Sequence, residues 1–361
     1  MHISVFSIPK TQVCMFDNNL IIEDIATFFG VSVTDLHTTP IRKLSENNIW
    51  KIEIGQRNFV LKRHFIHAPI NDCKFTPFEI ELNTLKVLKS KGCNVPKIIW
   101  KSDKKQSLLI EWCGNQTLDD MAQKQSNWHP IVNQAISQFC YIEEAFKKSQ
   151  DNLTAYVFPV NQDKKLQEIL DHCRKTIFYI IQASKKEKHS THQKRIDQCW
   201  ENISSHLFSK PKNLGGLDHN SHNILINQQK VFFIDFASIG WNWQTQRLVQ
   251  SFNSLGTKQA TGNFVSLINP ETIETYMSVS GQTKVHDDID LHHLLFYLSI
   301  IHRILRATSQ PNHPNSIRLY NAWGDLKTRL ERAIHIIIKS NLSNNFEANT
   351  IRQIIADCWL R

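Results

Sequence analysis

The 361-residue sequence has no CxxC pair, no long uncharged apolar run and no motif typical of nucleic-acid binding. Its eight cysteines are scattered, which argues against a paired-cysteine metal or redox site and is typical of reduced thiols. The most apolar later stretch, 291–305, is interrupted by three histidines and an arginine, so we expect no membrane span. Residues 1–17 lack a basic-then-apolar export pattern. We therefore expect a cytoplasmic protein without membrane or nucleic-acid partners.

Composition indicates a globular chain. Hydrophobic residues make up 41% and charged residues 21%, and the length favours about two domains. The formal net charge is +9, which favours binding of nucleotide phosphates but equally suits another acidic partner. Nothing in the sequence indicates an oligomeric state.

The first third of the chain changes from helical to strand patterning. Residues 20–30 have a helical apolar period closed by a glycine, and we assign 1–40 to an N-terminal helical extension. Three antiparallel strands are predicted next, at 41–44, 49–54 and 58–63. Lys62 falls on the third strand, and Glu81 falls in the first half of a helix predicted over 77–92.

The rest of the chain is mostly helical. Helices are predicted at 118–122, 130–148, 166–183, 195–208, 290–307 and 317–338, with a last one at the C-terminus. The pattern predicts an α+β fold with two lobes, a small antiparallel-sheet lobe over 41–113 and a large, mainly helical lobe over 114–361.

Two short segments carry the residues best suited to chemistry. Asp218 and Asn223 precede an apolar run, and a second apolar run ends at Asp235, so the sequence predicts a loop, a strand hairpin and an aspartate. Such a hairpin aims Asn223 and Asp235 at one point. Their oxygens are ligands that magnesium prefers. Asp218 would accept or orient the proton of an attacking hydroxyl.

Lys62, Glu81, Asp218, Asn223 and Asp235 occur in the order that a kinase-like phosphotransferase requires. A strand lysine reaches nucleotide phosphates, and a helix glutamate holds its ammonium in place. Glu79 competes with Glu81 for this pairing, and we prefer Glu81 because it is in register with the apolar face of its helix.

These motifs resemble the aminoglycoside phosphotransferase and choline kinase family, the small-molecule branch of the protein-kinase-like fold. Family members read His-Gly-Asp-x-x-x-x-Asn before the hairpin and Ile-Asp-Phe after it, where this chain has 216–223 and 234–236. The resemblance covers about 41–240. It implies phosphoryl transfer from ATP or GTP, with Mg²⁺, to a hydroxyl of a small molecule such as an antibiotic, a sugar, an amino alcohol or a biosynthetic intermediate.

The resemblance also implies roles for individual residues. Lys62 would bind phosphates and pair with Glu81, Asp218 would be catalytic, and Asn223 and Asp235 would bind the metal. Two further segments would complete the cofactor site. A bend with Ser45, Asn47 and Asn48 would cover the phosphates, and a connector made of Glu111, Trp112 and Cys113 would face the adenine. The bend lacks the glycines that let a backbone approach phosphates closely.

The chain departs from the family pattern at two places. Gly216 and Leu217 replace the residues before the catalytic aspartate, and an acidic pattern after Asp235 is replaced by 240–247. A nucleotide-binding module without turnover is therefore an alternative. A protein-kinase-like effector is a third, although no Ala-Pro-Glu segment follows. We interpret His219 and His222 as loop residues and not as metal ligands, because no third nitrogen or sulfur ligand is visible.

Overall fold

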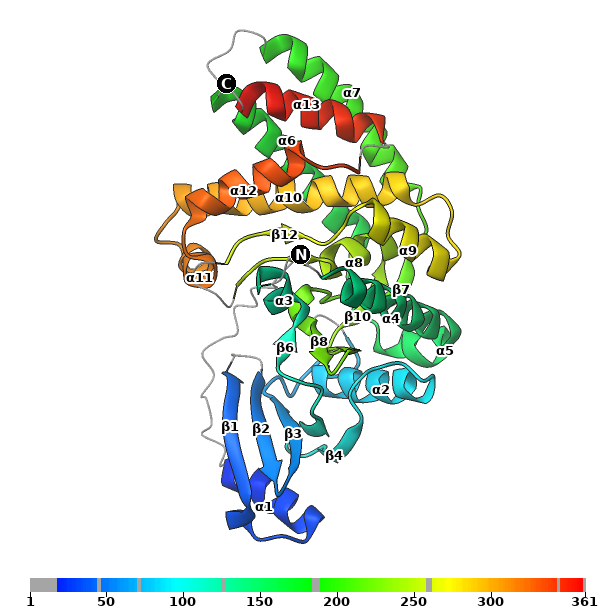
Figure 1. The fold of residues 1–361 in the computed structure, drawn as a ribbon, viewed down its shortest axis with the longest axis vertical. Coiled ribbons are helices and arrows are strands. Elements are labelled where there is room, and N and C mark those ends of the chain that lie inside the picture. Colours follow the sequence, from blue (N-terminus) through cyan, green and yellow to red (C-terminus); the bar gives the residue numbers. More distant parts are fainter. Residues whose placement is uncertain are drawn as a thin grey trace.

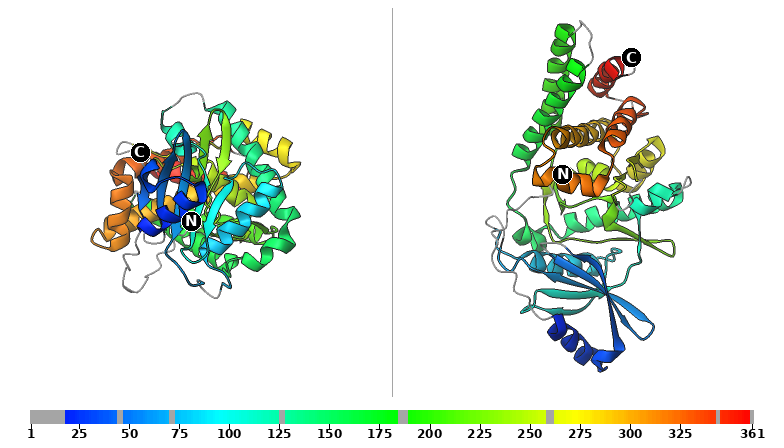
Figure 2. Two further views of the ribbon diagram at one scale, coloured as in Figure 1. Left: turned by 90° about the horizontal axis from the view of Figure 1, so that it is seen from below. Right: turned by 90° about the vertical axis from the view of Figure 1, so that its left-hand side faces the viewer.

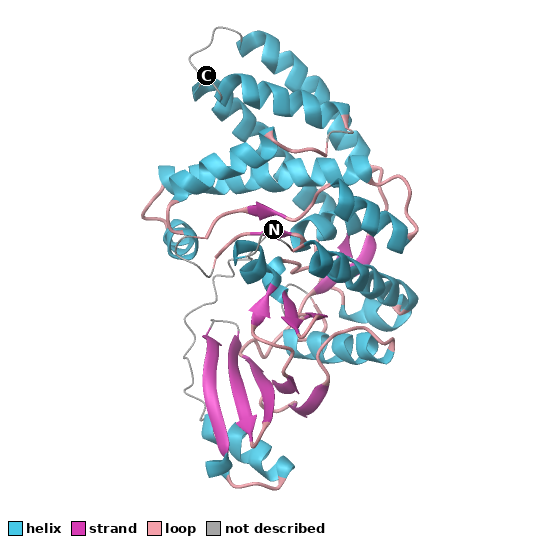
Figure 3. Ribbon diagram, viewed as in Figure 1, coloured by secondary structure: helices cyan, strands magenta, loops and turns pink. Residues whose placement is uncertain are grey.

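The protein has two lobes, a small sheet lobe at one end and a larger helical lobe (Figures 1 and 2). The computed structural model describes residues 18–43, 47–69, 73–124, 128–183, 189–257, 262–342 and 345–359. Figure 3 shows the strands gathered mainly in the small lobe and helices filling most of the other. The predicted two-lobed α+β fold is confirmed.

The small lobe is built on a five-stranded antiparallel sheet with the order β1-β2-β3-β5-β4. Its strands are β1 (Leu36–Lys43), β2 (Asn47–Ile54), β3 (Arg57–His64), β4 (Ile98–Ser102) and β5 (Ser107–Glu111). The helix α2 (Pro77–Ser90) buries an apolar face that includes Phe78, Leu82 and Leu85. Because α2 also contacts the helix α4 (His129–Lys148), it links the two lobes.

The N-terminal helix α1 (Asn18–Phe29) is part of this lobe. Ile21, Ile25 and Ala26 share a small core with sheet residues such as Ile52 and Leu61. The first strand begins at Leu36, so the predicted boundary at residue 40 falls inside β1. Burial of the α1 face against the sheet joins the extension to the strands in one packed unit.

The helical lobe carries two further sheets beside its helices. The hairpin β8 (Ile224–Asn227) and β9 (Lys230–Phe233) pairs with the short strand β6 (Gln116–Thr117). A second ribbon pairs β7 (Asn213–Gly216) with β10 (Ile239–Asn242). The short strands β11 (Asn253–Ser254) and β12 (Val265–Ser266) form a third pair.

Most of the lobe consists of helices, of which some were expected and others were not. Expected helices include α3 (Leu118–Lys124), α4, α6 (Gln162–Ala183), α7 (His189–Phe208), α10 (His286–Ser309) and α13 (Phe346–Trp359). Three were not predicted, α5 (Gln150–Leu153), α8 (Gln244–Ser251) and α9 (Pro270–Ser280). The apolar period of α8 is too weak to predict a helix, because only Leu248 and Val249 of its eight residues are apolar.

The single helix predicted over 317–338 is wrong. The segment forms two helices, α11 (Pro314–Trp323) and α12 (Leu326–Ile338). Gly324 takes a left-handed φ of 66°, and the Asp325 side chain accepts hydrogen bonds from the backbone N–H groups of Lys327 and Thr328. This turn and cap end one helix and start the next.

The described cysteines are all free thiols, as expected. Within the described ranges, every helix is too short or too polar to cross a bilayer.

Candidate active site

Lys62 is the centre of a buried charge cluster between the lobes. Its Nζ lies 2.8 Å from Glu81 Oε2 and 2.6 Å from Asp235 Oδ1. Burial alone lowers the pKa of Lys62, but Asp235 and Glu81 outweigh it and raise that pKa above its ordinary value. The ammonium is therefore charged and fixed in position.

Glu81 has a second partner that the sequence did not reveal. His64 Nε2, at the end of β3, lies 2.9 Å from Glu81 Oε2, and both side chains are 2% exposed. Burial raises the pKa of Glu81, but Lys62 and His64 together lower it to about 2. Glu79 has a different role, because its carboxylate accepts from the N–H of Thr76 and caps α2. The geometry thus favours Glu81 over Glu79 as the partner of Lys62.

Asp235 reaches Lys62 from the far end of the hairpin. Its φ of 68° lies in the left-handed region, which is uncommon outside glycine and costs energy in most residues. The backbone N–H of Ile234 donates to the carbonyl of Asn223 at 3.0 Å. The hairpin therefore brings the Asn223 and Asp235 segments side by side, as its sequence indicated.

Asn223 also holds the backbone at Asp218. Its Nδ2 donates to the Asp218 carbonyl at 2.9 Å, which turns its Oδ1 away from that contact. The side chain of Asn220 closes the turn, since its Oδ1 accepts from the N–H groups of His222 and Asn223. Asp218 itself is exposed. These contacts form a compact loop with an outward-facing carboxylate.

The donor set suits a magnesium ion shared with a bound nucleotide. Asn223 supplies an amide oxygen and Asp235 a carboxylate, and Mg²⁺ commonly takes one or two carboxylates together with substrate phosphates. No cluster of three or more His, Cys, Asp or Glu side chains with metal-binding geometry occurs in the described ranges. The set therefore fits a nucleotide-dependent magnesium better than a metal caged by the protein alone.

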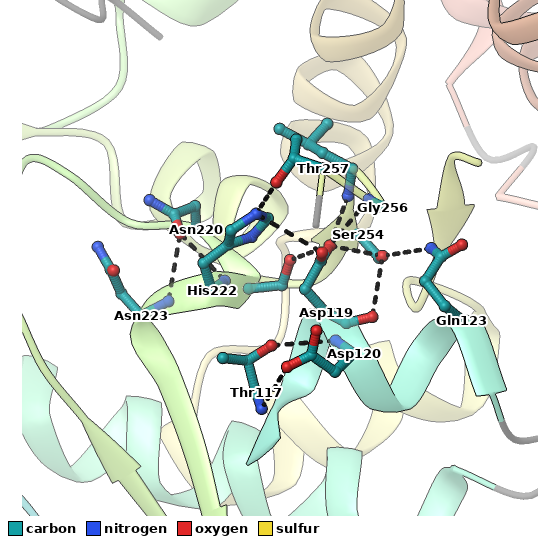
Figure 4. Close-up of polar contacts among 12 residues, drawn as sticks. Thr117, Asp119, Asp120, Gln123, Asn220, His222, Asn223, Ser254, Gly256 and Thr257 are labelled. Carbon is teal, nitrogen blue, oxygen red and sulfur yellow. Dashed lines mark hydrogen bonds and ion pairs between the residues drawn. The ribbon is translucent and has the colours of Figure 1, made fainter. Parts of the chain in front are cut away.

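A buried carboxylate anchors the loop that follows Asp218 (Figure 4). Asp119, 1% exposed, accepts at Oδ1 from the hydroxyls of Ser221 and Ser254 and from the N–H groups of Leu255 and Gly256. Its Oδ2 lies 3.6 Å from His222 Nε2. Asp119 thus joins α3 to the two residues before Asn223 and to the 254–256 segment. The sequence did not single it out.

The glycine at 216 has a steric reason. A Cβ at Gly216 would lie 2.6 Å from Nε2 of His219, whose ring is 5% exposed and packs edge-on against Phe139. Burial and the nearby Arg247 lower the pKa of His219 to about 3, so the imidazole is neutral. The ring of His219, the residue after Asp218, fills the space beside Gly216. His219 is thus a packed core residue.

Arg247 belongs to the segment 240–247, which departs from the family pattern, and it has a structural role there. It is fully buried, and its Nε donates to Glu143 Oε1 at 2.9 Å. Its Nη1 donates to the carbonyls of Asn213 and Asn242. These contacts tie together β7 and β10, the strands on either side of the 217–236 segment.

Comparison with solved structures identifies the fold. A choline kinase from Cryptosporidium parvum Iowa II superposes with a TM-score of 0.54 at 14% identity, over 88% of this chain and 95% of that one. A spectinomycin phosphotransferase in complex with ADP and spectinomycin gives 0.53 at 13%, over 94% and 98%. A choline/ethanolamine kinase family protein from Mesorhizobium loti gives 0.52 at 12%, over 93% and 98%. The chain has the kinase-like fold of these proteins. Its sequence matches no protein-family model and no curated protein.

In this kinase-like fold the connector between the lobes follows β5. Glu111 donates its N–H to the carbonyl of Lys97, and the Cys113 thiol contacts the Glu111 carbonyl at 3.6 Å. Burial, with Glu111, raises the pKa of Cys113 to about 12, so the thiol is neutral. Gly114 has φ +108°, and a Cβ there would lie 2.8 Å from the carbonyl oxygen of Ile226. Trp112 is the middle residue of the connector, and Lys51 Nζ lies over its ring at 5.4 Å from the centroid.

The predicted phosphate-covering bend needs correction. Ser45 lies outside the described residues. Asn47 and Asn48 are the first residues of β2 and pair with His64 and Arg63, so they are strand and not bend residues. Among the described residues, the Oδ1 atoms of Asn47 and Asn48 are buried without hydrogen-bond partners. Their role toward a nucleotide stays a prediction.

Proposed function

We propose that this protein is a small-molecule kinase that moves the γ-phosphoryl group of ATP or GTP to a hydroxyl. The observation that carries the proposal is the bridge of Lys62 between Glu81 on α2 and Asp235 after the hairpin. It unites charged groups from three separate elements, of which Lys62 and Glu81 are buried and Asp235 is 26% exposed. Burying charges is costly unless they are paired, which favours a functional reason for the cluster.

Each group has a defined part in this reaction. Lys62 neutralises nucleotide phosphates, and Glu81 with His64 holds its ammonium. Asn223 and Asp235 hold a magnesium ion that offsets charge on the transferring group. Asp218, exposed on a loop that Asn223 and Asn220 fix, orients the acceptor hydroxyl and takes its proton. The protein thus acts mainly by positioning and electrostatics.

The acceptor is proposed as a small hydroxyl compound, because structures with this fold include choline kinase and spectinomycin phosphotransferase. The net charge of +9 makes a polycationic antibiotic a poorer match than a neutral or anionic alcohol. ADP in the spectinomycin phosphotransferase structure supports nucleotide use.

The test is phosphoryl transfer from labelled ATP and GTP, with magnesium, to a panel of sugars, amino alcohols and antibiotics. Asp218→Asn should abolish turnover and leave nucleotide affinity nearly unchanged. Asp103→Asn, an exposed site in the β4–β5 turn, is the matched control and should retain wild-type activity. Equal activity of wild type and Asp218→Asn contradicts the assignment of Asp218.

The binding-only alternative rests on Gly216 and on the glycine-poor segment expected to cover the phosphates. The ring of His219 fills the space beside that glycine and so weakens the reason for expecting impaired catalysis. Nucleotide-dependent thermal stabilisation without transfer to any acceptor in the panel would favour the binding module. Transfer to a protein and to no small molecule would favour the protein-kinase alternative.

A further inference from the structure

A narrow cleft lies within the helical lobe, between α6, α8 and α10. Its volume is ≈ 30 Å³, and its walls are mostly apolar, with Leu166, Leu295, Phe296 and Ile300 among them. A site of this size holds one or two water molecules or a chemical group of similar bulk. It is separate from the Lys62 and Asp218 site.

The cleft contains an arginine without a partner. Arg303 lines it, and within the described part of the chain its guanidinium makes no hydrogen bond or ion pair. Burial lowers the pKa of Arg303 from its ordinary value. Arg303 is half-buried, and the fully buried Arg247 and Arg329 differ from it because both have hydrogen-bond acceptors. A partly buried cation that lacks a counter-ion is costly, so an anion that enters the cleft would be stabilised there.

Neutral polar atoms converge on the same cleft. Gln250 is 6% exposed and His292 is 3% exposed, and Gln250 Oε1 and His292 Nε2 have no hydrogen-bond partner among the described residues. Gln246 Oε1, which belongs to another residue lining the cleft, is also buried without a hydrogen-bond partner among the described residues. Buried polar atoms are normally paired, so unpaired atoms facing one cavity indicate a polar occupant. The glutamine amides can turn to present N–H groups to an anion.

The surroundings of Arg303 are cationic. The ring of His302 stacks on that of His172 at 4.3 Å across α6 and α10. Burial lowers the pKa of His302 to about 4, and His172, Arg306, Lys175 and Arg303 add to this shift. Lys175 and Arg306 are exposed. This part of the surface therefore attracts anions toward the mouth of the cleft.

The helix α8 separates the cleft from the catalytic loop. Gln246, Val249 and Gln250 line the cleft, at the i, i+3, i+4 spacing of one helix face. Arg247 and Ser251 lie on another face, where Arg247 abuts Gly215 and Ser251 contacts His219 at 3.3 Å. A ligand in the cleft would therefore contact α8, the helix that supports the Asp218 loop.

We propose that this cleft is a binding site for the carboxylate of a small organic acid. The planar guanidinium of Arg303 matches a carboxylate with two parallel hydrogen bonds, and Gln250 and His292 complete the polar shell. Phe296 and Ile300 contact the carbon atoms beside the carboxylate. The head group fills the available volume, and longer chains extend toward the mouth. The proposal does not depend on phosphotransfer.

Thermal unfolding of the full chain in sodium formate, acetate and butyrate, with sodium chloride at equal ionic strength, tests it. Wild type should show a saturable rise in Tm with carboxylates beyond the effect of chloride. Arg303→Met should raise the apparent Kd about tenfold or more, as expected for loss of a charge-assisted hydrogen-bond pair. Arg318→Met, which removes an exposed cation on α11 that does not line the cleft, should keep the response.

Three results overturn the proposal. One is a wild-type response that is absent or equal in chloride, another is an unchanged response in Arg303→Met, and the third is equal loss in Arg318→Met. Circular dichroism checks that the variants fold. If Arg303→Met does not fold, Gln250→Leu decides the matter, because it leaves the cation in place and should still weaken carboxylate binding several-fold.

Discussion

Lys62 Nζ and Asp235 Oδ1 lie 2.6 Å apart although the two residues are 173 positions apart in the chain. The contact crosses from the sheet of the small lobe to the hairpin of the large one. It therefore reports on the relative placement of the lobes as well as on the site. Removal of the Lys62 ammonium leaves both carboxylates without their shared cation, and removal of the Asp235 carboxylate leaves Lys62 with Glu81 as its remaining partner in this cluster.

Lys62→Met should destabilise the protein by about 3–5 kcal/mol, because it leaves Glu81 and Asp235 without their shared cation. Nucleotide affinity should fall as well. Urea unfolding and nucleotide titration measure the two effects. The matched control is Lys51→Met on the neighbouring strand, whose pair with Glu53 is partly exposed and should contribute about 0–1 kcal/mol. Equal losses in the two variants would contradict a special role for Lys62.

Gly216→Ala should destabilise the protein by about 1–3 kcal/mol, since the added Cβ would meet His219 Nε2 at 2.6 Å. His219→Ala removes the obstructing ring. In a double-mutant cycle, Gly216→Ala should therefore cost less in the His219→Ala background than in wild type. Turnover should fall in Gly216→Ala more than nucleotide affinity does. Strict additivity of the two substitutions would show that the ring does not occupy the space beside residue 216.

Stability should fall as the pH drops from about 6.5 to 4. Burial, as the first cause, lowers the pKa of His219 to about 3, of His292 to about 4 and of His293 to about 3. The unfolded chain binds protons at these residues near pH 6.5, whereas the folded chain stays neutral there. Each residue therefore favours unfolding by up to about 1.4 kcal/mol per pH unit over this range.

Urea unfolding at a series of pH values measures this slope. His302, whose pKa burial also lowers to about 4, adds a fourth proton uptake, so His293→Gln should reduce the slope by about one quarter. The exposed His67→Gln variant is the control and should leave the slope unchanged. Glu81 adds a loss at lower pH, because its folded pKa of about 2 gives stability above pH 4.5 that disappears as pH falls toward 2. A flat profile between pH 6.5 and 4.5 would contradict the burial of these imidazoles as neutral groups.

Local pattern was enough to predict the hairpin at 224–233 and the strand that carries Lys62. Alternating or continuous apolar residues specify strands, and Asp and Asn specify turns, through interactions within a few residues. The same local logic failed at Gly324, where a helix broken by one glycine and one capping aspartate looks continuous in its apolar period.

The order of Lys62, Glu81, Asp218, Asn223 and Asp235 was therefore readable in the sequence, since each has a recognisable local setting. The contacts that join them were decided only by the packing of the lobes. His64 beside Glu81, Asp119 beneath the catalytic loop and His219 in the space at Gly216 carry no local signal. Their roles come from burial and from partners distant in sequence, and the energies of buried charges and close packing depend on neighbours that a one-dimensional pattern does not contain.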